Sequence, residues 1–324
     1  MKAIEQYQIT INEFIAANKF SKFPQELYEP LDYIMALGGK RMRPVMVMMA
    51  CDLMNGKMEE AVHAAMAIET FHNFTLIHDD IMDNAPVRRG KITVHEKWNV
   101  NTAILSGDVM LIEAYALLMK YENDLLRSIL NIFNKSAIEV CEGQQIDMNF
   151  ESRMDVGMSE YIHMITLKTA VVLGASLEVG ALIAGVSKNQ AQHLYEFGKN
   201  MGIAFQLRDD YLDLYADPEK FGKQVGGDVI ANKKTFMLIK ALELAKDKES
   251  IELNKWLQAV EFNAIEKIEA IKNIFDKLAI PDLLDEEVKR YANLAWQAFE
   301  QVEATASKKE MMADFMNGLL AREV

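Results

Sequence analysis

Residues 59–83, EEAVHAAMAIETFHNFTLIHDDIMD, predict a long apolar helix that ends in a dense group of carboxylates. Turn-forming sequences flank this stretch at residues 55–56 and 84–91. Near its end, Asp79 and Asp83 stand four residues apart, so on a helix their carboxylates lie on one face, about one turn from each other. The stretch therefore predicts a helical fold with an acidic site built into a helix end.

The same DDxxD pattern returns at residues 209–213, DDYLD, at the end of a second predicted helix that starts near Ser187. Like charges at this spacing destabilise a helix by roughly 0.2–0.5 kcal/mol per pair, and neither box contains a Lys or Arg. The macrodipole at a helix C-terminus also disfavours anions. One box alone could be a solvated acidic patch, but two boxes in apolar surroundings indicate carboxylates that bind Mg²⁺ carrying a phosphorylated substrate.

Proline and glycine positions, together with hydrophobic periodicity, predict an all-α protein. Six prolines occur among 324 residues, none of them between residues 87 and 217, and alternating β-branched runs bounded by turns are absent from the sequence. No linker, low-complexity tract or charge block divides the chain, so one large domain over residues 1–324 is expected. The expected breaks between helices lie at residues 24–30, 37–40, 55–56, 84–91, 153–157, 187–188, 217–228 and 280–281.

Net charge and cysteine content narrow the function classes. The formal net charge of −13 argues against a nucleic-acid-binding surface, and two cysteines are too few for a disulfide framework or a zinc site. Residues 1–14 have no apolar signal-peptide core, and the most hydrophobic stretch, residues 171–186, is interrupted by Ser176 and Glu178. We therefore expect a cytoplasmic protein without a transmembrane segment.

Clusters of basic residues supply the positive charge that an anionic substrate needs in an acidic protein. GGKRMRP at residues 38–44 places two flexible glycines before three cations, a loop that can close around a phosphate. RRGK at residues 88–91 follows the first acidic box, and three lysines within residues 223–234 follow the second. Lys168, on an apolar helix, is either an anion ligand or a lysine whose ammonium group reaches solvent.

Taken in order, the motifs GGKRMRP, LIHDDIMDNAPVRRG, LKT and FQLRDDYLD, followed by GK and NKK, resemble those of the trans-isoprenyl diphosphate synthases, the polyprenyl synthetase family. The resemblance spans about residues 37–236. It implies an isoprenoid synthase fold, a large single-domain helical bundle around a central active-site cavity, and a homodimer. It also implies Mg²⁺-dependent, sequential head-to-tail condensation of isopentenyl diphosphate onto an allylic diphosphate.

The resemblance further implies a role for each motif residue. Three Mg²⁺ ions per active site would be bound by Asp79, Asp83 and Asp209. These ligands would be supported, through water or hydrogen bonds, by Asp80, Asp210 and Asp213. The allylic diphosphate would be held by Arg88, Lys168, Thr169, Gln206, Lys223 and Lys233. Isopentenyl diphosphate would be held by Lys40, Arg43, His72 and Arg89. The six aspartates and Lys168 would form the catalytic set.

The length of the product is indicated by the first acidic box and the aromatic residues before it. The box lacks the two-residue insertion that similar bacterial farnesyl diphosphate synthases carry. Phe74 lies five positions before the box and Phe71 eight positions before it, where residues of the family form the floor of the tunnel for the growing chain. The resemblance therefore favours a product of twenty carbons, geranylgeranyl diphosphate, with the fifteen-carbon farnesyl diphosphate next.

Three other protein classes share parts of this pattern. Di-iron carboxylate bundles use Glu-x-x-His pairs, which occur here as Glu60/His63, Glu69/His72 and Glu160/His163. That interpretation leaves both DDxxD boxes and every basic cluster unexplained. A class I terpene cyclase would have no use for Lys40 and Arg43, and a catalytically silent partner subunit would be expected to lack aspartates that are present here.

Overall fold

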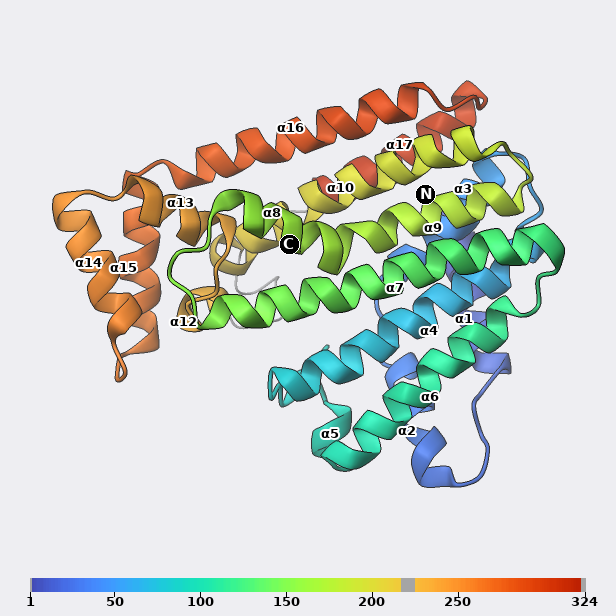
Figure 1. Cartoon of the computed structure of the whole chain (residues 1–324), viewed down its shortest axis with the longest axis horizontal. Coiled ribbons are helices and arrows are strands. Elements are labelled where there is room, and N and C mark those ends of the chain that lie inside the picture. Colours follow the sequence, from blue (N-terminus) through green and yellow to red (C-terminus); the bar gives the residue numbers. More distant parts are fainter. Residues whose placement is uncertain (1, 217–224, 322–324) are drawn as a thin grey trace. The chain divides into compact units, whose positions relative to one another are not determined.

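The computed structural model describes residues 2–216 and 225–321, and it is built almost entirely of helices (Figure 1). The all-α prediction is confirmed. The chain forms two compact units: the first comprises residues 1–134, 175–195 and 302–312, and the second comprises residues 135–174, 196–301 and 313–324. The expectation of a single domain over residues 1–324 stays a prediction, and each unit is described by itself.

The first unit contains the helix that carries the first acidic box. Its own helices are α1 (Lys2–Ala17), α2 (Gln25–Ala36), α3 (Met42–Leu53), α4 (Met58–Met82), α5 (Val94–Lys97) and α6 (Val100–Leu118). Helix α4 packs against both α3 and α6. Helix α3 is buried along most of its length, with Met46, Met48 and Met49 fully enclosed. Because methionine side chains are unbranched and adaptable, they fill the irregular space beside α4 and help to hold it in place.

A two-stranded hairpin follows α4, and the sequence did not predict it. Strand β1 (Val87–Arg88) pairs antiparallel with β2 (Lys91–Ile92), and Arg89 and Gly90 between them have φ values of 52° and 71°. Two consecutive residues with positive φ are typical of a type I′ turn. Strands of two residues are too short to show alternating hydrophobicity, so the sequence indicated only a break here.

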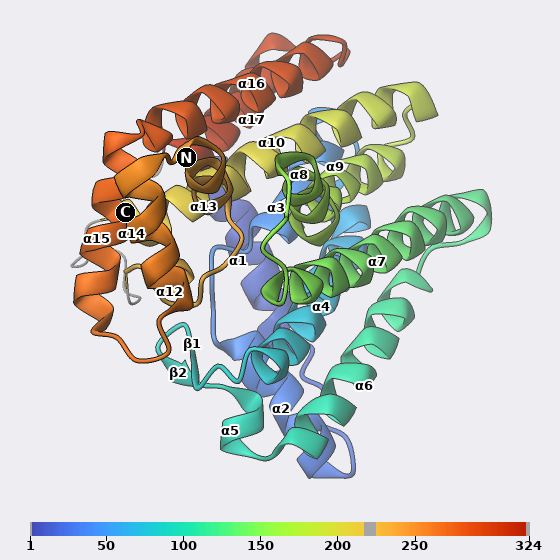
Figure 2. The ribbon, with the colours of Figure 1, turned by 60° about the vertical axis from the view of Figure 1, so that its left-hand side comes forward.

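The second unit contains the end of the helix that carries the second acidic box. Its own helices are α8 (Met158–Ile165), the π-helix η1 (Thr166–Ala170), α12 (Gly227–Ile230), α13 (Phe236–Leu244), α14 (Asp247–Gln258), α15 (Ala264–Lys277) and α16 (Ile280–Glu300). Helices α14 and α15 form a helical hairpin (Figure 2). The core of this unit includes Leu207, Phe236, Ile271 and Phe275, which pack the acidic-box helix against α13 and α15.

Four longer helices contribute residues to both units. They are α7 (Asn123–Glu151), α9 (Val171–Ile183), α10 (Lys188–Tyr215) and α17 (Ala306–Leu320). The two predicted box helices are confirmed by α4 and α10. Helix α4 ends at Met82 with Asp83 as its C-cap, and α10 begins one residue after Ser187.

Two predicted breaks were wrong in their extent. The break at residues 24–30 ends early, because α2 begins at Gln25 and contains Pro30, which is buried although a proline inside a helix removes one backbone hydrogen bond. The break near residue 280 lies at Leu278 and Ala279 instead, since Pro281 stands in the first turn of α16, where its missing N–H is not needed. Most of the break at residues 217–228 falls outside the described residues.

Two helical stretches, Val100–Leu118 and Met158–Ile183, are long and apolar enough to cross a membrane by length and composition alone. In the most apolar 18-residue window of Val100–Leu118, 28% of the residues are buried inside the protein. In the corresponding window of Met158–Ile183, 72% are buried. Core helices meet the same criteria, so the expected absence of a transmembrane segment stays a prediction.

Candidate functional site

The three carboxylates of the first acidic box differ in burial. Asp80 is only 1% exposed, and both of its carboxylate oxygens accept from Arg88 Nε, at 2.9 and 2.8 Å. Asp79 is half-buried and Asp83, at the helix end, is exposed. A residue next to Asp79 is turned by about 100° around the helix, which carries Asp80 toward the protein interior. The predicted phosphate ligand Arg88 is thus held in place by a carboxylate of the box itself.

The second acidic box repeats this arrangement with different partners. Asp210 is 4% exposed, and its carboxylate accepts from the Tyr161 hydroxyl at 2.5 Å and from Gln206 Nε2 at 3.0 Å. Asp209 is exposed and Asp213 is half-buried. In each box, therefore, the second aspartate is buried and hydrogen-bonded, and the first aspartate is more exposed than the second. Tyr161 was missed by the sequence analysis, because nothing in the sequence links it to a residue 49 positions away.

These carboxylates suit Mg²⁺, which prefers hard oxygen ligands and keeps several of its positions for water and phosphate. Asp83 and Asp209 are exposed and Asp79 and Asp213 are half-buried, whereas Asp80 and Asp210 are buried among internal hydrogen-bond donors. Within residues 2–216 and 225–321, no group of three or more His, Cys, Asp or Glu side chains is arranged to hold a metal ion. Mg²⁺ bound through one or two carboxylates plus a diphosphate needs no such group.

Asp228, which was predicted only as the end of a break, adds a further negative charge beside the second box. Its backbone N–H donates to Asp213 Oδ2 at 2.9 Å. Burial, followed by the charge of Asp228, raises the pKa of Asp210 to about 7 and that of Asp213 to about 6. Carboxylates that repel one another in this way favour a cation nearby.

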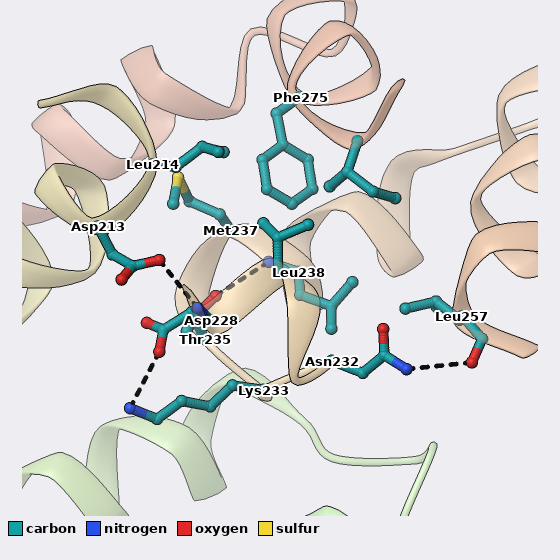
Figure 3. A pocket seen from close by; sticks show the side chains of 12 residues that line it. Asp213, Leu214, Asp228, Asn232, Lys233, Thr235, Met237, Leu238, Leu257 and Phe275 are labelled. Atoms are coloured by element: carbon teal, nitrogen blue, oxygen red, sulfur yellow. Dashed lines mark hydrogen bonds and ion pairs between the residues drawn. The ribbon is translucent and has the colours of Figure 1, made fainter. Parts of the chain in front are cut away.

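Lys233 and Lys234, adjacent in the segment after α12, differ in burial and in their contacts. Lys233 is 42% exposed at its side chain, and its Nζ lies 3.4 Å from Asp228 Oδ1 beside a pocket that Asp213 also lines (Figure 3). Burial acts against the charge of Lys233, but nearby carboxylates, Asp228 foremost, raise its pKa. Lys234 is buried and donates to Asn232 O at 3.2 Å. Lys233 is therefore the better placed for a phosphate, and Lys223 lies outside the described residues.

Lys168 and Thr169 stand on the π-helix η1, which the sequence did not predict. Lys168 Nζ lies 2.6 Å from Asp147 Oδ2, and Thr169 Oγ1 donates to Gln206 Oε1 at 3.1 Å. A β-carbon at Gly143 of α7 would lie 2.4 Å from the backbone nitrogen of Lys168, so only glycine permits this approach. Single π-turns inside helices frequently mark functional sites. Asp147, which the sequence analysis missed, holds the lysine that was predicted to bind phosphate.

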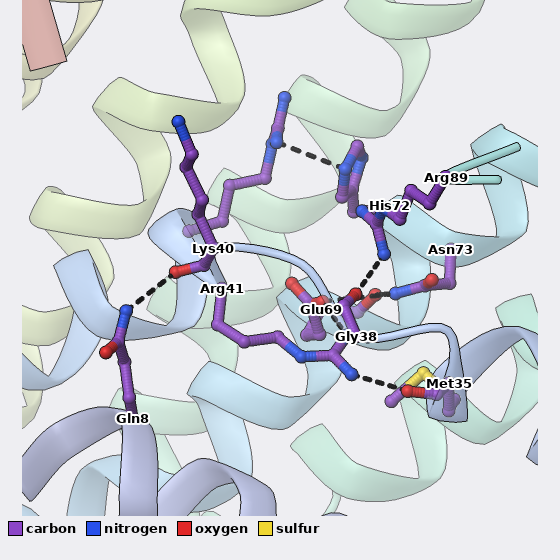
Figure 4. Close-up of polar contacts among 10 residues, drawn as sticks. Gln8, Met35, Gly38, Lys40, Arg41, Glu69, His72, Asn73 and Arg89 are labelled. Atoms are coloured by element: carbon purple, nitrogen blue, oxygen red, sulfur yellow. Dashed lines mark hydrogen bonds and ion pairs between the residues drawn. The ribbon is translucent and has the colours of Figure 1, made fainter. Parts of the chain in front are cut away.

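The loop at residues 38–44 and the hairpin turn form a second basic cluster in the first unit (Figure 4). Arg43 Nη1 lies 3.2 Å from His72 Nε2, and Arg89 Nη1 donates to Gly38 O. Gly39 has a φ of 119°, and a β-carbon there would lie 2.7 Å from Arg89 Cζ. The two glycines therefore shape the loop and also make room for Arg89. The backbone carbonyl of Lys40 accepts from Gln8 Nε2 at 3.1 Å.

Arg41 departs from the predicted group of three cations. Its φ is 49°, and its side chain turns into the core, where Nη1 donates to Glu69 Oε1 at 2.5 Å and Nη2 donates to Met35 O. Asn73 Nδ2 donates to the same Glu69 oxygen at 3.2 Å. Because Glu69 pairs with Arg41 and His72 with Arg43, this Glu-x-x-His pair does not converge on a metal, contrary to the di-iron interpretation.

Arg43, Arg89 and His72 lie close enough together to affect one another's pKa values. Burial lowers the pKa of Arg43 to about 10, with a further contribution from Arg89. Burial, followed by the charges of Arg43 and Arg89, lowers the pKa of His72 well below its ordinary value. His72 is therefore neutral, and its Nε2 can accept from Arg43. Positive charges that disfavour one another in a partly buried place create a site for an anion.

Phe71 and Phe74, the predicted floor of the product tunnel, belong to a row of rings along α4. Their centroids lie 5.7 Å apart, and Phe71, which is 3% exposed, makes an edge contact with Phe133 of α7 at 5.3 Å. Phe74 is half-buried and contacts His78 at 4.8 Å. Neither phenylalanine lines the groove of about 640 Å³ that Arg41 borders. Their role in product length stays a prediction.

Comparison with known proteins agrees with the motifs. The polyprenyl synthetase family profile matches residues 24–275. The geranylgeranyl diphosphate synthase of Sulfolobus acidocaldarius is 42% identical over 244 residues, 74% of each chain, and the short chain isoprenyl diphosphate synthase of Methanothermobacter thermautotrophicus is 34% identical over 319 residues, 98% of this chain and 97% of that one. A crystal structure of a geranylgeranyl pyrophosphate synthase, 41% identical, covers 99% of both chains with a TM-score of 0.94. The chain belongs to the polyprenyl synthetase family and is an enzyme of the prenyltransferase class.

Proposed function

We propose that this protein is a Mg²⁺-dependent trans-polyprenyl diphosphate synthase that condenses isopentenyl diphosphate head to tail with an allylic diphosphate. Its product is a short all-trans polyprenyl diphosphate, geranylgeranyl diphosphate by preference and farnesyl diphosphate next. The observation that carries this proposal is the shared arrangement of the two acidic boxes, each with a buried, hydrogen-bonded second aspartate and a first aspartate that is more exposed than the second. The names of the relatives support the same chemistry.

Asp79, Asp83 and Asp209 would hold the metal, three ions per active site; Asp83 and Asp209 are exposed, and Asp79 is less buried than its neighbour Asp80. When bound, Mg²⁺ would neutralise the diphosphate and stabilise the negative charge that develops as the allylic carbon–oxygen bond breaks. Asp80 orients Arg88, and Asp147 orients Lys168. Both cations would therefore be preorganised to bind the allylic diphosphate. Thr169, Gln206, Lys223 and Lys233 complete that group.

Isopentenyl diphosphate would be bound by Lys40, Arg43, His72 and Arg89. A neutral His72 accepts from Arg43 and keeps its guanidinium in place, while the half-buried Arg43 and the exposed Arg89 offer charge-assisted hydrogen bonds to an incoming diphosphate. In this proposal the proton lost after condensation passes to the diphosphate that has just been released, and no side chain is assigned the role of general base. A class I cyclase would have no use for this second basic cluster.

Helix α6 supports the proposal of a homodimer. Leu105, Ile112 and Met119, spaced by seven residues, are 58%, 65% and 62% exposed. Residues at that spacing lie on one face of a helix, and an exposed apolar face on a helix of which little is buried is typical of a subunit interface. A cytoplasmic location remains part of the proposal.

One incubation tests the proposed function. The purified protein is given Mg²⁺, labelled isopentenyl diphosphate and, separately, dimethylallyl, geranyl or farnesyl diphosphate, and the dephosphorylated products are sized. We expect linear twenty-carbon chains, loss of product with EDTA, and a fall of several orders of magnitude in kcat for Asp209→Asn without a change in thermal unfolding. Cyclic hydrocarbons formed without isopentenyl diphosphate would instead identify a cyclase, and no turnover with any primer would identify a silent subunit.

A further inference from the structure

Lys267 of α15 is a buried cation that the proposed chemistry does not use. Its side chain has no exposed surface, and it is one of the largest fully buried side chains in the described residues. Its ammonium donates to Ile230 O at 3.2 Å and to Asn232 Oδ1 at 2.7 Å, and it lies 4.2 Å from the centroid of the Phe262 ring. Burial lowers the pKa of Lys267, and the two hydrogen-bond acceptors of its ammonium group are neutral oxygens.

A charge in such a place costs stability, because a buried ammonium loses its hydration and gains only neutral acceptors and a ring face. A methionine of similar length would fill the same space without that cost. Unlike methionine, lysine donates hydrogen bonds, and each of these N–H donors fixes the position of one acceptor. Both acceptors, Ile230 and Asn232, belong to one short segment, residues 228–233, which covers most of α12 and the turn that follows it.

Backbone hydrogen bonds hold part of that segment, among them Asn232 N–H to Val229 O at 3.2 Å, and Lys267 adds two side-chain contacts. Ile230 is the last residue of α12, where helix carbonyls lack partners within the helix, and Asn232 has a φ of 53°. The Lys267 ammonium donates to the Ile230 carbonyl, and its second hydrogen bond orients the side chain of Asn232. The other end of the Asn232 amide donates to Leu257 O at 3.1 Å, which ties the turn to α14 as well (Figure 3).

The segment carries two charged groups of the proposed site. Asp228 stands at its start and Lys233 at its end, and the backbone N–H of Lys233 donates to Asp228 O at 2.9 Å. Their side chains form an ion pair at 3.4 Å, and the Asp228 N–H reaches Asp213 of the second acidic box. Lys267 therefore holds two of the four residues that lie between Asp228 and Lys233, namely Ile230 and Asn232.

We infer that Lys267 is a positioning residue for the allylic diphosphate, acting through Lys233 by fixing Ile230 and Asn232. The inference rests on the proposed function, in which Lys233 binds that diphosphate. Lys267 itself touches neither substrate nor metal in this assignment.

The first test compares Lys267→Met with Lys277→Met, a change to an exposed lysine on the same helix. With Lys267→Met we expect the KM for the allylic diphosphate to rise about tenfold, as for loss of one charge-assisted contact, while the KM for isopentenyl diphosphate changes less than twofold. Lys277→Met should leave both values unchanged. An unchanged allylic KM in Lys267→Met, or an equal rise for both substrates, overturns the inference.

The second test is a double-mutant cycle with Lys233→Met. If Lys267 acts through Lys233, adding Lys267→Met to Lys233→Met should change the allylic KM less than twofold, whereas a purely structural role would multiply the two effects. Should Lys267→Met not fold, Asn232→Ala replaces it in the same cycle, with an expected threefold rise that also vanishes in the Lys233→Met background. If Lys233→Met alone leaves the allylic KM unchanged, the proposed role of Lys233 is wrong; if only the Lys267 and Asn232 variants have no effect, this inference is wrong and the proposed function stands.

Discussion

Like-charged residues one or two positions apart in a motif differ in burial in this protein. In the loop at residues 38–44, Arg41 turns into the core toward Glu69, while Arg43 stays with His72 in the basic cluster. In the first acidic box, Asp80 is internal and Asp79 is not. Since charge type is the same within each pair, burial and partner decide what each residue does.

Replacing the two arginines should therefore give two different phenotypes. Arg43→Ala should weaken isopentenyl diphosphate binding by about 1.5–3 kcal/mol, with less effect on the allylic KM and on stability. Arg41→Met should lower the free energy of unfolding by about 3–5 kcal/mol, because it leaves Glu69 buried without its partner. Steady-state kinetics with each substrate varied and urea unfolding measure the two effects. Equal kinetic effects of both variants would contradict the assignment.

Asp210 should make the metal-free protein less stable as pH rises. Its pKa is raised from 3.8 to about 7, so between these values the unfolded chain has released a proton that the folded protein retains. The contribution to stability is therefore fully present below about pH 4 and is lost as pH rises toward 7. Asp210→Asn, which mimics the neutral acid, should gain stability relative to the parent over this range. Urea unfolding in EDTA at several pH values measures the difference; a constant difference from pH 4 to pH 7 would exclude this role for Asp210.

Phe74→Ala should lengthen the product by at least one isoprene unit. Burial of five more carbons favours elongation by about 4 kcal/mol at roughly 0.8 kcal/mol per carbon, so growth stops only where a side chain blocks the path. Because Phe74 is half-buried, its loss should cost less than the roughly 3–5 kcal/mol of a core phenylalanine. Chromatography of dephosphorylated products shows the change. Phe71→Ala in addition should lengthen the product further but cost more, since Phe71 packs on Phe133. An unchanged product distribution at normal turnover would remove Phe74 from this role.

At the scale of elements, the π-helix η1 and the hairpin β1–β2 place functional residues where regular helix would not. Both segments are short, and each carries residues that were predicted to bind diphosphate: Lys168 and Thr169 on η1, and Arg88 and Arg89 at the hairpin. Such irregular segments are kept by close packing around them. For η1, that packing includes Gly143 of α7.

Gly143→Ala should accordingly displace η1. A β-carbon 2.4 Å from the Lys168 nitrogen cannot be accommodated without a backbone shift, so we expect a loss of about 1–3 kcal/mol in stability and a higher allylic KM. Gly318→Ala in α17 is the matched control, because its β-carbon would meet nothing within 4 Å and alanine favours helix by up to about 1 kcal/mol. Calorimetry and steady-state kinetics compare the two variants. Normal allylic binding in Gly143→Ala would show that the position of η1 is unimportant.

At the scale of the whole molecule, the exposed face of α6 should govern assembly. Ile112→Asp places a charge in the middle of the apolar row, and desolvating that charge in an interface should shift the protein from dimer toward monomer. Light scattering coupled to gel filtration measures the mass. Ile251→Asp, at another exposed isoleucine on α14, is the control and should leave the mass unchanged. A monomeric parent, or a dimer in both variants, would show that α6 is not the interface.

Local features of the fold were predictable because their causes lie within a few residues. The apolar spacing of residues 59–83 and the turn-forming sequences beside it predicted α4 and its acidic end, and α10 was predicted in the same way. The short hairpin, η1 and the interior Pro30 were not, since two-residue strands and a single π-turn leave no periodic signal and since packing outweighs the preference of one proline.

The sequence by itself determined the helical class, the family and the residue types of the site, because helix periodicity and motif order are properties of neighbouring positions. Only the tertiary structure decided which of these residues are internal. Asp80 meets Arg88, Arg41 meets Glu69 and Asp210 meets Tyr161, contacts across 8, 28 and 49 positions. Whether a charge is buried depends on partners brought together by packing, and the energy of that burial is absent from any short stretch of sequence.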